Sequence, residues 1–281
     1  MNRILRVSLA AAAGLLVLVG TGCDKLRSRD ELNKGVAAYK NAKYAEAIDR
    51  FKSAIALDPT NPNAKLYLAT AYMTQWIPGA DSPENKQLAE QAKKEFSEVL
   101  QKDPNDKIAL ASLASLAYNQ SGSLQGDEKL KMLDEARDWN SKLIQADPKN
   151  KEAYYSLGVI AWSKWYPELG KARADLGMKP EDPGPLKDKK LRESLKEKYT
   201  AVIDEGISNL NKALEVDPEY DDAMAYLNLL VREKADLADN GDQYKEQIKV
   251  ADDWVQKALE TKKKKAARQP GNVGITQEEK K

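Results

Sequence analysis

The hydrophobic and small residues of the chain follow a helical pattern that is clearest between Gly35 and Pro59. Large and small apolar residues recur there at three- and four-residue intervals, as on one face of an α-helix, and a proline closes the stretch. The pattern predicts one helix from about Asp30 to Asn41 and a second from about Tyr44 to Leu57. A short turn joins the two helices.

The same arrangement returns along the chain at constant distances from four prolines. Each proline lies twelve residues after a small residue of one helix and ten residues before a matching position of the next. The prolines are Pro59, Pro104, Pro148 and Pro218; the residues before them are Ala47, Ala92, Ala136 and Gly206, and those after them are Ala69, Ala114, Gly158 and Asn228. The prolines themselves are 45, 44 and 70 residues apart. Since the segments on either side of each proline have constant lengths, the residues that lengthen these intervals must lie between the first and second helix of a pair.

This pattern resembles the tetratricopeptide repeat, a helical hairpin of 34 residues. The resemblance implies an all-α, right-handed solenoid over residues 30–262, with about five hairpins. Four of these have an enlarged connection between their two helices. Small residues would sit where helices cross closely, large ones would fill the gaps, and prolines would end the second helices. The repeat-packing residues are then Gly35, Ala47, Phe51, Ala54, Pro59, Ala69, Ala92, Phe96, Pro104, Ala114, Ala136, Pro148, Gly158, Gly206 and Pro218.

The enlarged connections contain loop-forming residues. QWIPGADSPENK precedes a helix expected from about Lys86 to Gln101, and NQSGSLQGDE is expected to be a flexible insert in the third repeat. The fourth repeat is expected to have a loop around residues 180–185, followed by a helix from about Lys187 to Val216. A break at Asn240-Gly241 precedes a capping helix from Gln243 to about Lys262.

The third repeat departs from the pattern in its second helix. Asn140 stands where a large apolar residue is expected, and the adjacent Trp139 is expected to take over its packing.

Residues 1–22 have the pattern of a targeting segment. Arg3 and Arg6 precede an apolar run, which ends in Leu-Val-Gly-Thr-Gly-Cys. The ending resembles a bacterial lipoprotein signal, although Gly20 replaces the usual leucine. The resemblance implies cleavage before Cys23, a lipid on Cys23, and a lipidated tether over residues 23–29. The protein would then face the periplasm, with inner or outer membrane left open. The alternative is an ordinary signal peptide that happens to end near a cysteine.

The charge of the chain is balanced, with 45 basic and 44 acidic residues. Such a chain has no net field to attract nucleic acid, so nucleic acid is not an expected partner. Charged residues make up 32% of the sequence, and residues 263–281 lack apolar periodicity. We expect these last residues to be a disordered tail.

Several kinds of catalytic chemistry are excluded by composition. The chain contains no histidine, its single cysteine is Cys23, and it has no Ser-x-x-Lys pattern or glycine-rich phosphate loop. We therefore expect no enzyme activity, no metal, no cofactor and no small-molecule substrate.

The resemblance also implies that the first helix of each hairpin lines a concave groove. Its apolar and aromatic candidates for binding a partner are Tyr39, Leu66, Met73, Tyr118, Tyr155, Val159 and Trp162. These side chains could anchor a bound peptide, or the inserts could cover them as an enlarged core. Trp76 and Trp165, each followed closely by proline, either pack between inserts or form a partner-facing patch on the insert edge.

The expected function is that of a membrane-anchored scaffold that binds other envelope proteins. One alternative is a structural subunit of an outer-membrane assembly or secretion complex. Another is a glycan-binding or hydrolytic accessory of the cell wall.

Overall fold

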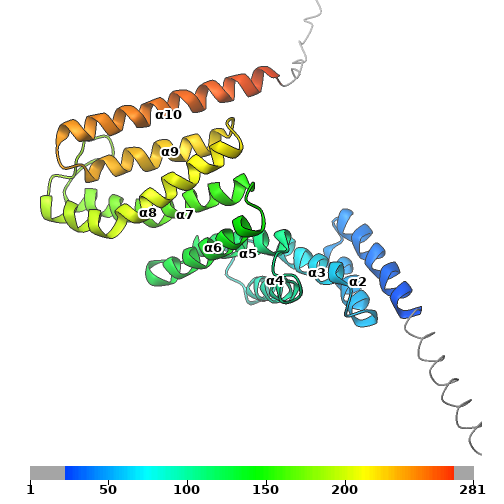
Figure 1. Ribbon diagram of the computed structural model, residues 1–281. Helices are drawn as coiled ribbons and strands as arrows, with labels where there is room; N and C mark the ends of the chain where they lie inside the picture. The colour runs from blue at the N-terminus through cyan, green and yellow to red at the C-terminus, as the bar shows by residue number, and fades with distance from the viewer. Residues whose placement is uncertain (1–22, 269–281) are drawn as a thin grey trace, which may run out of the picture. The chain divides into compact units, whose positions relative to one another are not determined.

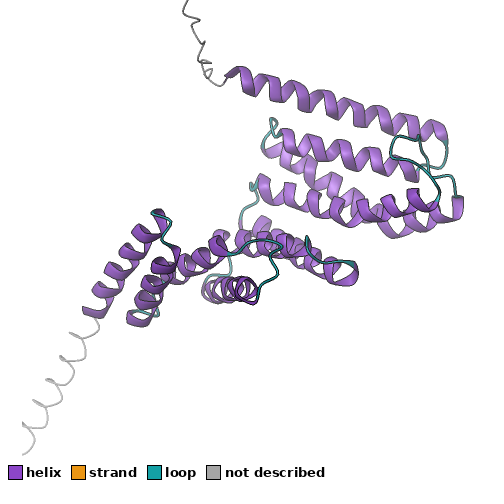
Figure 2. Ribbon diagram, turned by 180° about the vertical axis from the view of Figure 1, so that it is seen from behind, coloured by secondary structure: helices purple, strands orange, loops and turns teal. Residues whose placement is uncertain are grey.

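The computed structural model describes residues 23–268, and all regular structure among them is helical (Figures 1 and 2). The all-α helical-repeat prediction is confirmed. Five successive helix pairs occur in the described residues. The first three are residues 23–40 with α2 (Tyr44–Leu57), α3 (Pro62–Gln75) with α4 (Pro83–Lys102), and α5 (Lys107–Ser121) with α6 (Gly126–Ala146). The last two are α7 (Lys151–Asp175) with α8 (Lys189–Val216), and α9 (Asp221–Lys234) with α10 (Gly241–Arg268); the 3-10 turn η1 (Ala235–Leu237) extends α9. None of these described helices has the length and apolar character to cross a membrane.

The pairs are joined by four-residue turns that all begin with Asp-Pro. In the first turn, the Asp58 N–H donates to the Ala54 carbonyl, and the Asn61 N–H donates to the Asp58 carbonyl. The same two bonds form in the turns beginning at Asp103, Asp147 and Asp217. Each turn therefore closes one helix and starts the next in the same way, which explains the constant distances around the prolines.

The enlarged connections are mostly helical, which differs from the prediction of long loops. Helix α4 begins at Pro83 rather than Lys86, because the Ser82 side chain caps it by accepting from the Asn85 N–H. In the third repeat, helix α6 begins at Gly126, so only residues 122–125 separate it from α5. Most of NQSGSLQGDE is thus helix rather than flexible insert.

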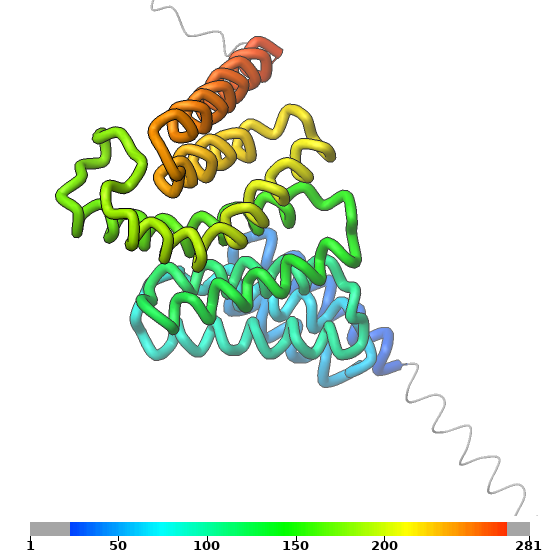
Figure 3. Tube along the Cα trace, turned by 60° about the vertical axis from the view of Figure 1, so that its left-hand side comes forward, coloured from blue at the N-terminus to red at the C-terminus, as the bar shows by residue number. Residues whose placement is uncertain are grey.

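The fourth repeat has the longest irregular connection, residues 176–188. This loop includes the region predicted around residues 180–185, and α8 begins at Lys189, close to the predicted Lys187. Helix α7 runs on through Pro167 to Asp175, because its added turns bury Leu169 and Ala172 against α8. Figure 3 shows the yellow-green loop doubling back at the end of α7 and α8.

Both predicted ends of the solenoid need correction. Residues 24–29, predicted as a tether, are helical, and Ser28 is fully buried with its hydroxyl donating to the Ala54 carbonyl at 2.8 Å. Helix α10 continues to Arg268, so residues 263–268 are not a disordered tail. The Arg268 guanidinium pairs with Glu219 at 2.6 Å and holds this last turn. The predicted signal peptide, residues 1–22, and the remainder of the predicted tail, residues 269–281, lie outside the described residues.

The chain divides into two compact units, and the division in the sequence falls within α6, between Lys142 and Leu143. In the N-terminal unit, α3 packs against both α2 and α4. Phe51 and Phe96 are fully buried in its core, together with the small residues Ala47, Ala69 and Ala92.

In the C-terminal unit, α7 packs along α8, and α9 packs along α10 (Figure 1). The core contains the fully buried Trp165, Ile203 and Leu227. Gly158 of α7 and Gly206 of α8 permit the close approach of these helices: a Cβ added to Gly206 would lie 2.6 Å from the Ala161 Cβ.

The other repeat-packing candidates occupy the positions that their residue types suit. Gly35, Ala54, Ala114 and Ala136 are buried, and the four prolines lie exposed in the turns. Asn140 also stays in the interior, 4% exposed, and its amide donates to the Ala136 carbonyl at 2.9 Å. Trp139 is only half-buried, so it packs beside Asn140 rather than in its place.

Candidate functional site

Three of the predicted groove residues lie half-buried on the N-terminal unit. Tyr39, Leu66 and Met73 pack against its core while keeping part of each side chain accessible. The Tyr39 hydroxyl shares a hydrogen bond of 2.8 Å with Thr74 on α3, and its ring meets Tyr44 edge-on. These contacts hold the Tyr39 ring in a fixed orientation. Tyr118, on α5, is also half-buried.

The groove candidates of the C-terminal unit form an aromatic cluster between α7 and α9. Tyr155 meets Tyr220 and Tyr226 with ring centroids 5.2 and 5.5 Å apart, and Trp162 meets Tyr226 edge-on at 5.7 Å. Val159 of α7 is buried. Most of these rings therefore hold α9 against α7.

Tyr166, which the sequence analysis did not select, extends the cluster to the surface. Its ring stacks on Trp162 at 4.8 Å and remains 49% exposed. The Trp162 indole N–H donates to Glu233 of α9 at 2.9 Å. Trp162 is thus fixed from one side and covered by an accessible tyrosine on the other.

Trp76 and Trp165 do not form an exposed patch. Trp76 is 8% exposed and packs with Ala89 and Leu116. Trp165 is fully buried, and its ring lies against Tyr199 of α8. The structure therefore favours the packing alternative, while Ile77, next to Trp76, is 64% exposed.

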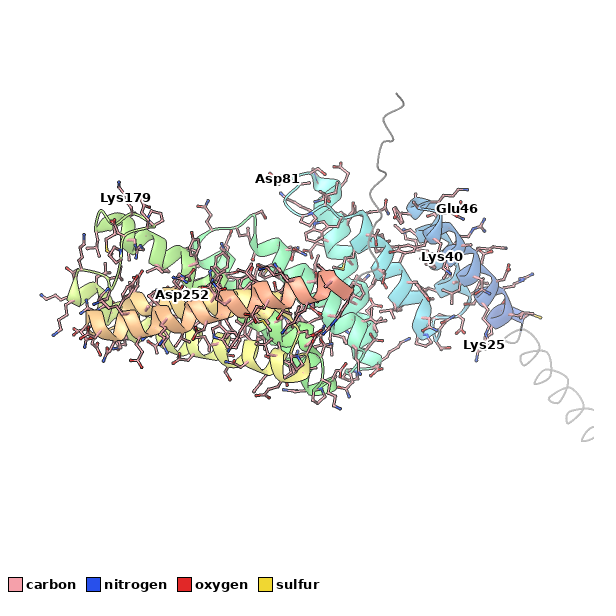
Figure 4. The ribbon with its side chains drawn as sticks, turned by 90° about the horizontal axis from the view of Figure 1, so that it is seen from above. Lys25, Lys40, Glu46, Asp81, Lys179 and Asp252 are labelled. Atoms are coloured by element: carbon pink, nitrogen blue, oxygen red, sulfur yellow. The ribbon has the colours of Figure 1, made fainter. Side chains whose placement is uncertain are left out.

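A cavity of about 520 Å³ lies in the C-terminal unit, where the extended end of α7 meets the 176–188 loop, the end of α9, η1 and the start of α10. Its lining includes Tyr166, Arg173, Glu181, Glu233, Asp236 and Tyr244. Figure 4 shows Lys179 on this loop and Asp252 on the neighbouring α10. The long connection of the fourth repeat therefore builds one wall of a pocket.

Arg173 and Asp236 fix that wall. The Nη1 of Arg173 forms a buried ion pair of 2.6 Å with Asp236, and its Nη2 donates to the carbonyls of Lys179 and Asp182. The Leu186 N–H donates to the Asp236 carbonyl at 3.0 Å. The loop is therefore held to both α7 and η1. Burial raises the pKa of the Asp236 carboxyl, while its pairing with Arg173 acts in the opposite direction.

Glu233 is a cavity-lining acid that is only partly satisfied by the protein. One carboxylate oxygen accepts from Trp162, and the other is buried with no hydrogen-bond partner among the described residues. Burial raises the pKa of Glu233 to about 7, against the lowering effect of the Trp162 hydrogen bond. A carboxyl group with this pKa changes charge near neutral pH.

Sequence reasoning missed this cavity, although two signals were present. One signal was that the fourth repeat has the largest insert. The other was that two adjacent charged residues, Arg232 and Glu233, lie on the first helix of the fifth repeat. No spacing rule shows that the insert folds back onto α9.

Among the described residues, no cluster of His, Cys, Asp and Glu side chains suits a metal ion. Cys23 is exposed.

Comparisons with known proteins agree with this architecture. Residues 38–75 match the family model described as tetratricopeptide repeat. A crystal structure of MamA protein is 16% identical, with a TM-score of 0.52, and the match covers 88% of this chain and 98% of that one. A MamA chain from Desulfovibrio magneticus RS-1 is 17% identical, with a TM-score of 0.50, over 85% of this chain and 96% of the other. A comparison with curated proteins finds no match. The chain therefore has the fold of an all-helical tetratricopeptide-type solenoid, with a recognisable tetratricopeptide repeat at residues 38–75.

Proposed function

We propose that the protein is a membrane-anchored scaffold of the bacterial envelope that binds other proteins through the first helices of its repeats. The observation that carries this proposal is the pair formed by Trp162 and Tyr166. A half-buried indole, fixed by Glu233 and stacked under an exposed tyrosine, supplies apolar area together with polar handles. Rigid aromatic side chains of this kind are common anchors in protein interfaces, because little side-chain entropy is lost on binding.

The N-terminal unit offers a second set of anchors. Tyr39 and Met73 are half-buried on neighbouring first helices, and Tyr39 is orientated by Thr74. Such side chains suit the apolar face of a helix or an extended peptide segment. The proposed partners are other envelope proteins.

The proposed anchor is a lipid on Cys23. The segment before it has the charge and apolar pattern of a lipoprotein signal, and Cys23 itself is helical and exposed. Two or three acyl chains hold a protein stably on a bilayer, because each buried methylene contributes about 0.8 kcal/mol. The solenoid would then face the periplasm from the inner or the outer membrane.

Photo-crosslinking in living cells tests the scaffold proposal. A benzophenone amino acid replaces Tyr166, Tyr39 or Met73, one at a time, in the full chain. Control positions are Val250 and Leu259, which are exposed apolar residues of α10. We expect a discrete crosslinked partner from the first three positions and not from the controls.

The outcome distinguishes the binding face. The same partner crosslinked equally from Val250 and Leu259 would contradict the assignment to the first helices. An absence of crosslinks from all five positions would contradict the scaffold function itself.

A further inference from the structure

We propose that the cavity beside α7 is a binding site for a cationic nitrogen group, an alkylammonium or a guanidinium, which pairs with Glu233. This proposal concerns the cavity alone and does not depend on the scaffold function. The group has two sources, a free small amine or the side chain of a basic residue in a peptide, and both present the same chemistry to the site.

The charges of the lining favour a cation. Both lining arginines are already neutralised: Arg173 pairs with Asp236 at 2.6 Å, and Arg232 pairs with Asp252 at 2.5 Å. The acidic side chains of Glu181 and Glu233 have no ion-pair partner in the described structure. Excess negative charge therefore remains in the cavity whenever Glu233 is ionised.

The carboxylate of Glu233 supports the same ligand class. Glu233 lines the cavity, and its buried oxygen has no partner among the described residues to offset its charge, so an ionised Glu233 attracts an ammonium or a guanidinium placed in the cavity. The Nε–H of Arg173 is also buried without a partner. The charge of Arg173 is already met by Asp236.

The size and walls of the cavity fit such a group. A volume of about 520 Å³ lies within the usual range of small-ligand pockets. Tyr166 and Tyr244 line the cavity, and the face of an aromatic ring attracts a desolvated cation through a cation–π interaction. Its loop wall is fixed by Arg173 and Leu186, so the site is formed before a ligand arrives.

Binding of a cation is expected to depend on pH. A cation favours the ionised form of Glu233, whose pKa of about 7 leaves much of it protonated at pH 6. The other ionisable groups that line the cavity are Tyr166, Arg173, Glu181, Asp182, Arg232, Asp236 and Tyr244, and Asp236 forms an ion pair with Arg173. We therefore expect tighter binding at pH 8 than at pH 6.

Calorimetric titration of the purified full-length protein tests the proposal. The probes are L-arginine against its neutral isostere L-citrulline, and the peptide acetyl-Ala-Arg-Ala-amide against the same peptide with citrulline. We expect an arginine probe to bind roughly tenfold or more tightly than its citrulline counterpart. Binding by free arginine alone identifies a small-amine site, and binding by the peptide identifies a side-chain site.

Three variants separate the site from general effects on folding. Glu233→Gln keeps an oxygen that can accept from Trp162, and we expect it to lose binding about tenfold together with the pH dependence. Ala174→Trp, at an exposed cavity-lining position, leaves every charge in place and should block entry. Glu181→Gln removes an exposed acid from the rim and should change affinity much less than Glu233→Gln. Circular dichroism confirms that each variant is folded.

The proposal is overturned if citrulline probes bind as well as arginine probes, or if folded Glu233→Gln binds arginine like the parent protein. It is also overturned if no cationic probe binds at millimolar concentration at pH 8.

Discussion

Gly158 and Gly170 lie in the same helix, α7, but have different surroundings. A Cβ added to Gly158 would overlap the Leu210 side chain, whereas one added to Gly170 would meet nothing within 4 Å. We expect Gly158→Ala to lower the free energy of unfolding by about 1–3 kcal/mol through overpacking. Gly170→Ala should raise it by roughly 0.5–1 kcal/mol, because alanine is the better helix former. Urea unfolding measures the free energy of unfolding of both variants. If Gly158→Ala changed it in the same direction and by the same amount as Gly170→Ala, the crossing of α7 and α8 would not be tightly packed.

Glu233 gives the protein a pH-dependent stability. Its pKa is raised from 4.5 to about 7, so between these values the folded state holds a proton that the unfolded state releases. The resulting stability is present below pH 4.5 and is lost as the pH rises through about 7. The shift corresponds to about 3 kcal/mol.

Glu233→Gln should remove this component and leave the variant relatively more stable than the parent at pH 8. Urea unfolding at pH 5, 6, 7 and 8 measures the difference. Asp236 remains in both proteins, and its charge contributes to the raised pKa of Glu233, so the comparison measures the Glu233 carboxyl in the presence of Asp236. Parallel stability curves for the two proteins would mean that the Glu233 carboxylate is solvated rather than buried.

Single residues also show how far the sequence could be interpreted. The resemblance to the tetratricopeptide repeat implied packing roles for Ala47, Ala92 and Phe51, and all three are fully buried, because helix crossings leave room for particular side-chain sizes. The burial of Asn140 was not predicted. Its side-chain amide donates to the Ala136 carbonyl, and this local hydrogen bond lowers the free-energy cost of burying the amide. Trp162 was predicted as a groove residue, but its hydrogen bond to Glu233 was not predicted. The two residues are 71 positions apart in the chain, and no local pattern connects them.

At the level of single helices, side-chain caps begin several first helices. The Asp106 carboxylate accepts from the Ala109 N–H at 2.8 Å at the beginning of α5. Asp106→Ala should lower the free energy of unfolding by about 1 kcal/mol, because it leaves a helix N–H without its partner. Asp106→Asn keeps an acceptor oxygen and should retain most of the stability. Urea midpoints of the two variants measure this, and equal losses would assign the effect to charge rather than to capping.

The inserts show why helix boundaries were predicted less well than helix order. Their location between first and second helices follows from the constant distances around the prolines. Their helical content does not, because the added turns of α7 and α8 are stabilised by each other: Trp165 and Leu169 pack with Tyr199 across the hairpin. The Ser82 cap was a local signal for the beginning of α4 that the sequence analysis did not use. The cavity depends on the loop meeting η1, a contact that no local pattern contains.

At the scale of the whole molecule, one register of repeats is divided into two compact units. The repeat pattern runs without a phase change through the boundary at Lys142 and Leu143, because α6 itself is continuous there. Periodicity describes how each helix packs on its neighbours, which is a local property of solenoids. It therefore predicted the hairpins and left the division into units undetermined.

The proposed lipid on Cys23 would attach almost directly to folded structure, because residues 24–29 are helical and Ser28 is buried. Cys23→Ser should abolish incorporation of radiolabelled palmitate and move the protein from the membrane to the soluble fraction. Its circular dichroism should be unchanged, since Cys23 is exposed. Gly20→Leu, which restores the usual lipoprotein residue, should keep the label and the membrane location. If the parent protein carries no label and fractionates like Cys23→Ser, the proposed lipid anchor is contradicted, and the segment acts as an ordinary signal peptide.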